Sequence, residues 1–126
     1  MKLRIRNDSL RLRLNQDEVE RFAAEGVVED VVSFGPSAGQ GLAYRIRRDG
    51  LVPAMRANLA NNTIEIIIPA AEAAAWSSTK QVGMELDQDI GNGRVLNILV
   101  EKDFARLKPR SPDDVLNKFP HPRSED

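Results

Sequence analysis

Residues 10–14 read Leu-Arg-Leu-Arg-Leu, and residues 64–68 read Ile-Glu-Ile-Ile-Ile. Apolar residues at every second position are typical of a β-strand that buries one face. The two stretches are 54 positions apart, and the same offset superimposes residues 1–49 on residues 55–103 without a gap and with seven identities. We therefore predict two copies of one unit, because a repeat constrains an architecture more strongly than local propensity does.

Each copy is predicted to run strand, strand, helix, strand, strand. In the first copy, Asn7-Asp8-Ser9 has the residue types of a turn between two strands. Asn15 and Glu18 have the spacing of a capping box at a helix start, and Gly26 predicts the end of that helix. In chain order, the elements are expected at residues 2–6, 10–14, 15–26, 28–34, 42–48, 55–59, 63–68, 70–76, 81–87 and 95–101.

Large apolar side chains match between the copies. Phe22 falls on Trp76 in the two predicted helices, and Val28 falls on Val82 in the strand that follows each helix. We expect the matched side chains to form one hydrophobic core. The expected core residues are Leu12, Leu14, Phe22, Ile66, Ile68 and Trp76.

The fold class predicted from this order is α+β. We expect a mostly antiparallel, eight-stranded sheet, either barrel-like or partly open, with two short helices and pseudo-twofold symmetry. Closure would remove the edges of the sheet, whereas an open sheet would carry both helices on one side. The chain of 126 residues is expected to be a single domain, 1–126, with a tail at 104–126 that follows the second copy.

The composition argues against several kinds of site. The chain has no cysteine, so no disulfide and no thiolate metal site is expected. Its one histidine, His121, lies between prolines in the tail, which argues against a Ser–His–acid triad. We predict no cofactor, no metal site and no catalytic residue. The start of the chain lacks the apolar run of a signal peptide, and no segment approaches the ~20 apolar residues of a membrane helix, so we expect a cytoplasmic protein.

Arginines gather in the first copy, on the strand faces opposite the leucines. If the strands are neighbours, these charges share one surface, which could bind a phosphate or an acidic protein partner through forked guanidinium contacts. The alternative is a solvated face balanced by nearby carboxylates. Nucleic acid is not the expected partner, because the net charge is −1 and no aromatic residue is interleaved with the arginines. The candidate residues are Arg4, Arg6, Arg11, Arg13, Arg45 and Arg47.

The same face of the second copy is partly apolar, because Ile67 replaces Arg13 and Leu99 replaces Arg45. Apolar side chains that point away from the core need a cover. The tail or a second subunit could supply it, so a monomer and a homodimer are both expected; otherwise these strands are buried on both faces. The tail residues that could form the cover are Val115, Leu116 and Phe119.

Two functions are compatible with these features. The first is a non-enzymatic binding or interaction module that uses the arginines or the exposed apolar positions. The second is a small enzyme that acts on an anionic, phosphate-bearing substrate in an arginine-lined cleft, with carboxylates that hold a divalent ion. The alternation directs leucines rather than arginines to the inner face, which favours the first function.

The first residues, MKLRIR at 1–6 with Ser9 and RLRL at 11–14, resemble the start of a family of short uncharacterised bacterial proteins. The resemblance spans nearly the whole chain. It implies no activity, because the family is a domain of unknown function. Later segments that fit the same pattern are Phe34-Gly35-Pro36, Leu99–Phe104 and Phe119-Pro120.

Overall fold

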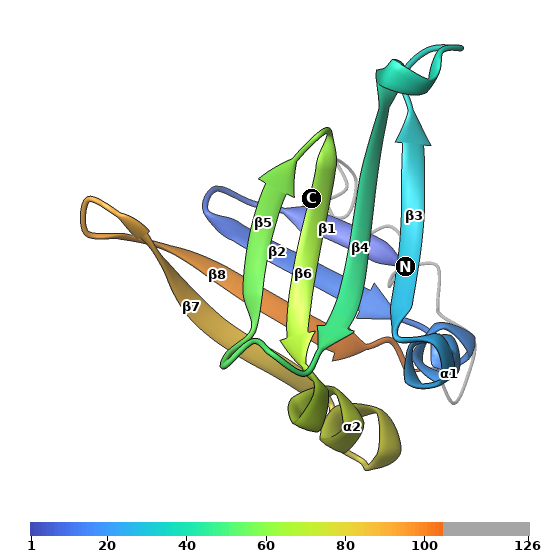
Figure 1. Cartoon of the computed structure of the whole chain (residues 1–126), viewed down its shortest axis with the longest axis vertical. Helices are drawn as coiled ribbons and strands as arrows, with labels where there is room; N and C mark the ends of the chain where they lie inside the picture. Colours follow the sequence, from blue (N-terminus) through green and yellow to red (C-terminus); the bar gives the residue numbers. More distant parts are fainter. Residues whose placement is uncertain (105–126) are drawn as a thin grey trace, which may run out of the picture.

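The computed structural model describes residues 1–104, and Figure 1 shows its two helices and eight strands. Every strand and helix expected in this range is present, with small shifts at the ends. The elements are β1 (Lys2–Ile5), β2 (Ser9–Leu14), α1 (Gln16–Glu25), β3 (Val27–Ser33), the short 3₁₀ helix η1 (Ala38–Gln40), β4 (Gly41–Asp49), β5 (Arg56–Ala60), β6 (Thr63–Pro69), α2 (Ala70–Ser78), β7 (Gly83–Gly91) and β8 (Arg94–Lys102).

The eight strands form two four-stranded sheets. Sheet A has the order β1-β2-β8-β7 and sheet B the order β3-β4-β6-β5. Each sheet joins the opening hairpin of one half of the chain to the closing strands of the other half, and the central pairs, β2–β8 and β4–β6, are parallel. In Figure 1 the two sheets cross, with both helices at one end. The α+β class is confirmed, but the expected single sheet is wrong: no closed barrel forms, because two sheets bury their apolar faces against each other.

The two parallel pairs have equivalent registers. Leu12 pairs with Val100 in sheet A, and Ile66 pairs with Ile46 in sheet B. Each residue of one pair lies 54 positions from its counterpart in the other pair. The centre of each sheet is therefore built in the same way.

The ungapped match is wrong at the strand that follows each helix. Val28 pairs with Ile46, whereas Met84 pairs with Val100, so Met84 rather than Val82 is the counterpart of Val28. Val28 and Met84 are both buried, whereas Val82 precedes β7 and is 51% exposed. The offset between the halves is 54 residues where the helices begin and 56 where the following strands begin, so two additional residues lie between the start of α2 and the start of β7.

The core lies between the sheets and beneath the helices. All six expected core residues are fully buried, and among the described residues no polar or charged residue is buried with them. Side chains of this size each contribute roughly 1.5–3 kcal/mol when they leave water. The inner face is therefore a packed apolar core, built from the leucines and isoleucines of the central strands.

Local sequence signals set the ends of α1. The side chain of Asn15 accepts a hydrogen bond from the backbone N–H of Glu18, and the Glu18 carboxylate accepts one from the N–H of Asn15, both at 2.9 Å. Gly26 ends the helix with a φ of 81°, a conformation that glycine adopts without strain. The predicted capping box and helix end are both confirmed. Neither α1 nor α2 has the length and apolar character to cross a membrane.

The two outward-facing apolar residues differ in exposure. Ile67 is buried and Leu99 is half-buried. Ile67 lies between Arg47 and Arg56 in the register of sheet B, where the aliphatic stems of arginines can shield an apolar neighbour. The expected cover by the tail falls on residues outside the described range.

Candidate functional site

The six candidate arginines lie on two different sheets. Arg4, Arg6, Arg11 and Arg13 belong to β1, β2 and the turn between them in sheet A, whereas Arg45 and Arg47 belong to β4 in sheet B. They are expected to share one surface if their strands are neighbours, and this condition is not met, because β2 pairs with β8 and not with β4. Alternation along a strand predicts which face a side chain takes, but not which strand lies beside it.

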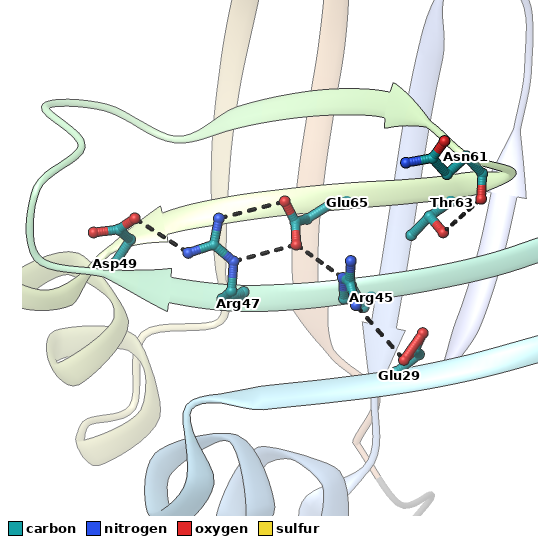
Figure 2. Close-up of polar contacts among 7 residues, drawn as sticks. All are labelled: Glu29, Arg45, Arg47, Asp49, Asn61, Thr63 and Glu65. Carbon is teal, nitrogen blue, oxygen red and sulfur yellow. Dashed lines mark hydrogen bonds and ion pairs between the residues drawn. The ribbon is translucent and has the colours of Figure 1, made fainter.

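In sheet B, Figure 2 shows both arginines converging on Glu65 of β6. Arg45 Nε donates to Glu65 Oε2 at 2.8 Å, and Arg47 Nε donates to the same oxygen at 3.2 Å. Arg47 Nη1 also donates to Asp49 at 3.1 Å, and Arg45 Nη1 lies 3.8 Å from a carboxylate oxygen of Glu29. Carboxylates of this chain thus occupy both guanidinium groups.

The titration of these carboxylates reflects their partners. A hydrogen bond from Arg47 holds the pKa of Glu65 below its ordinary value, against the opposing effect of burial, and the charge of Arg45 adds to the shift. The backbone N–H of Leu51 and then Arg47 lower the pKa of Asp49. Both carboxylates are ionised at neutral pH, so the cluster is a set of ion pairs and not a source of protons for catalysis.

In sheet A, Glu101 of β8 lies beside Arg11 and Arg13. Arg11 Nε donates to Glu101 Oε1 at 2.7 Å, and Arg13 Nε lies 2.9 Å from the same oxygen. The Arg13 Nε–H is buried without a hydrogen-bond partner, so its contact with Glu101 is one of charge alone. Lys2 forms an ion pair with Asp103 at 2.9 Å.

Each sheet has an ion pair at equivalent positions of its central strands, but the acidic and basic residues of the pair are exchanged between the sheets. Arg11 in sheet A and Glu65 in sheet B are 54 positions apart, and so are Arg47 in sheet B and Glu101 in sheet A. The contact between Arg11 and Glu101 is thus the counterpart of the contact between Glu65 and Arg47. The outer face of each central strand pair therefore has an ion pair at equivalent positions, with the acidic and basic residues exchanged.

The balance of charge distinguishes the two clusters. We call Lys2, Arg4, Arg6, Arg11 and Arg13 the basic half of sheet A. Its five cations meet two carboxylates, and among residues 1–104 Arg4 and Arg6 make no ion pair. The sheet B cluster has two arginines and three carboxylates. Of these two clusters, the basic half of sheet A is the one whose arginines are not all paired with carboxylates among residues 1–104.

Sequence reasoning missed the opposite edge of the same face. Glu85, Asp87 and Asp89 alternate along β7 and are exposed, and no cation pairs with them within the described range. We call these three residues the acidic half of sheet A. The alternation of carboxylates along the predicted strand could have indicated an acidic face. Its position at the edge opposite the arginines depends on the order of the strands in the sheet, which the sequence does not show.

The described residues form a groove away from the candidate arginines. A groove of about 740 Å³ opens beside the start of α1, and Asp17, Glu20, Ser77 and Lys102 contribute to its lining. None of the six candidate arginines reaches it. No group of three or more potential metal ligands occurs in residues 1–104. This groove is therefore not the arginine-lined cleft of the enzyme hypothesis.

A family model matches residues 1–123. The chain belongs to DUF7009, a family of unknown function. Membership confirms the resemblance to a domain of unknown function. Searches of curated proteins and of solved structures gave no match. The family has no described function, so the geometry of the two sheets is what indicates a function for this chain.

Proposed function

We propose that this DUF7009 protein is a non-catalytic interaction module that binds an acidic partner protein through the basic half of sheet A. The observation that carries the proposal is the charge balance of the outer faces. Arg4 and Arg6 are exposed and make no ion pair in the described residues, whereas Glu65 engages both Arg45 and Arg47. A partner's carboxylates can pair with the first two arginines without breaking an existing contact.

The chemistry of the face favours carboxylates of a protein. Guanidinium groups present paired N–H donors that match a carboxylate. The described residues of this face include no aromatic side chain on which a base could stack. Half-buried Leu99 and Asn97 lie next to the arginines and offer the apolar and amide contacts that protein interfaces use.

The site is held in place before a partner arrives. β1 and β2 pair over four residues of each strand, and Glu101 fixes Arg11 from the neighbouring strand. Arginines on rigid strands lose less conformational entropy on binding than arginines on loops. We expect attraction over a distance of about one Debye length, and therefore binding that weakens with salt.

Binding of a fluorescein-labelled octaglutamate peptide, measured by anisotropy at about 50 mM and about 300 mM salt, tests the proposal. The wild-type protein should bind at low salt and lose affinity at high salt. The Arg4→Ser/Arg6→Ser variant should bind at least tenfold more weakly. Arg45→Ser/Arg47→Ser is the matched control and should bind like wild type, with folding of both variants checked by circular dichroism.

Equal losses of affinity for octaglutamate in the two double variants would contradict the proposal, because the sheet B arginines would then contribute as much to binding as the sheet A arginines. Tighter binding of single-stranded DNA than of octaglutamate would contradict the choice of an acidic protein.

The equivalent registers support a second part of the proposal, that the two halves of the chain are copies of one unit. The matching ion pairs with exchanged charges support it as well. An experimental structure in which the halves fail to superimpose, with a gap of two residues opened before β7 and closed again before β8, would contradict this part.

A further inference from the structure

The outer face of sheet A carries charges of opposite sign at its two edges. One row across the sheet consists of Arg4 on β1, Arg11 on β2, Leu99 on β8 and Glu85 on β7, which are neighbours in register. The row therefore runs from positive, through apolar, to negative. The row of Arg6, Ser9, Asn97 and Asp87 also runs from positive to negative, whereas the row of Lys2, Arg13, Glu101 and Gly83 has its carboxylate on β8.

Except for Lys2, which pairs with Asp103, the charges at both edges lack an ion-pair partner within the described chain. Asn97 Nδ2 donates to Glu85 and to Asp87, both at 2.9 Å, which orients these carboxylates without neutralising them. Arg4 and Arg6 at the other edge likewise make no ion pair among residues 1–104. The two edges are three strand spacings, about 14 Å, apart. The opposite charges of one chain are therefore too far apart to pair with each other.

We infer that a second copy of this chain is the acidic partner, and that two copies stack the outer faces of sheet A. The inference rests on the proposed function and names the partner of the same site. A twofold axis parallel to the strands, between β2 and β8, places β1 of each copy over β7 of the other. Arg4 then lies over Glu85 of the second copy, and Arg11 over its Leu99.

The charge pattern selects this orientation. A twofold axis perpendicular to the strands would stack β1 on β1 and β7 on β7, with like charges opposed. In the parallel orientation the outer rows also match, because Arg6 faces Asp87 and Arg13 faces Glu101 of the other copy. Arg4, Arg6 and Arg13 of one copy thus each meet a carboxylate of the other, whereas Lys2 lies over Gly83.

Leu99 lies near the centre of the stacked faces. It would pack on the aliphatic stem of Arg11 of the second copy, which excludes water from the middle of the contact. Strand spacing and rise give a face of roughly 20 Å by 20 Å. A contact of this size fits a weak, salt-sensitive dimer better than an obligate one.

Sedimentation velocity of the full chain, over a range of concentrations and at low and high salt, tests the inference. Wild type should dimerise reversibly, and more strongly at low salt. Arg4→Glu and Glu85→Arg should each abolish the dimer, because each places like charges opposite one another twice. Arg56→Glu, at an exposed position on the outer face of sheet B, is the matched control and should dimerise like wild type.

An equimolar mixture of R4E and E85R chains gives the sharpest result. In the mixed dimer both contacts between positions 4 and 85 are attractive again, so the mixture should dimerise although neither variant does so alone. Octaglutamate should dissociate the wild-type dimer, since it occupies the basic half. A mixture that stays monomeric, or an R56E variant that loses the dimer, would overturn the inference.

The inference and the proposed function fail in different ways. A wild-type protein that is monomeric throughout, but binds octaglutamate through Arg4 and Arg6, overturns the dimer and supports the acidic-partner site. A dimer that persists in both R4E and E85R overturns the inferred face. Absence of both octaglutamate binding and dimerisation overturns both.

Discussion

The rings of Phe22 and Trp76 meet edge to face, with centroids 6.0 Å apart and planes at 66°. The two residues lie on α1 and α2 at positions 54 apart, and both are fully buried. The indole N–H of Trp76 donates to the carbonyl of Val82 at 3.0 Å. The contact between the Phe22 and Trp76 rings joins the two helices, and therefore the two halves of the chain, at the end of the core.

Replacing Phe22 by alanine should lower the free energy of unfolding by roughly 3–5 kcal/mol, because a large buried ring leaves a cavity. Urea denaturation followed by the fluorescence of Trp76, the single tryptophan, measures the change. Phe34 is 72% exposed, so Phe34→Ala is the control and should change the free energy by less than about 0.5 kcal/mol. Similar losses in the two variants would contradict the described core.

Arg48 should stabilise the C-terminal end of α1. Its Nη1 donates to the carbonyls of Phe22 at 3.1 Å and of Ala23 at 2.6 Å, where the helix dipole favours a cation. Arg48→Gln should cost roughly 0.3–1 kcal/mol, with a smaller cost at high salt. Arg21→Gln on the same helix is the control, since Arg21 is exposed and has no described partner. A loss of unfolding free energy in Arg21→Gln as large as that in Arg48→Gln would argue against a stabilising contact between Arg48 and the end of α1.

Glu65 should stabilise the fold in a pH-dependent way. Removing its charge in Glu65→Gln leaves Arg45 and Arg47, which are both partly exposed to water, without their shared carboxylate and should cost roughly 0.5–1.5 kcal/mol at neutral pH. The pKa of Glu65 in the folded protein is lowered from its ordinary 4.5. The stabilisation is therefore fully present above about pH 4.5 and is lost as the pH falls through the lowered folded value.

Denaturation curves of wild type and Glu65→Gln between neutral and acidic pH measure this dependence. The difference in the free energy of unfolding should shrink as the pH falls below the ordinary value of Glu65. Glu20→Gln, at an exposed position of α1, should give a small difference that does not shrink in this way. A difference in the free energy of unfolding between wild type and Glu65→Gln that stays constant with pH would argue against the ion pairs of Glu65.

Gln88 of β7 should hold the edge strand β5 against sheet A. Its amide accepts a hydrogen bond from the N–H of Ala57 at 2.6 Å and donates one to the carbonyl of Ala57 at 3.1 Å. Ala57 is 8% exposed, so Gln88→Met leaves two nearly buried backbone groups without partners, at a cost of roughly 1–3 kcal/mol. Hydrogen exchange of the Ala57 amide should accelerate. Gln16→Met, at an exposed position, is the control and should leave the exchange rate of the Ala57 amide unchanged. An unchanged exchange rate in Gln88→Met would show that the hydrogen bonds from Gln88 do not protect Ala57.

The sequence by itself determined the order of the elements and the face that each side chain takes. Apolar residues at alternate positions of 10–14 identified a half-buried strand, and Asn15 with Glu18 identified the start of a helix. These signals are readable because they depend on backbone geometry within a few residues: side chains alternate across a strand, and a cap acts within one turn. The burial of Phe22 followed from the apolar spacing of its helix, and that of Trp76 from its match to Phe22 at an offset of 54.

Only the tertiary structure decided which strands lie side by side. Alternation along β2 is satisfied equally by β4 or β8 as a neighbour, because both present an apolar inner face. The choice came from burying two whole sheets against each other, a contact between residues far apart in the chain that no local pattern records. That choice gave Arg11 its partner Glu101, 90 positions away, separated the arginines into two clusters, and placed Arg4 and Glu85 at opposite edges of one face.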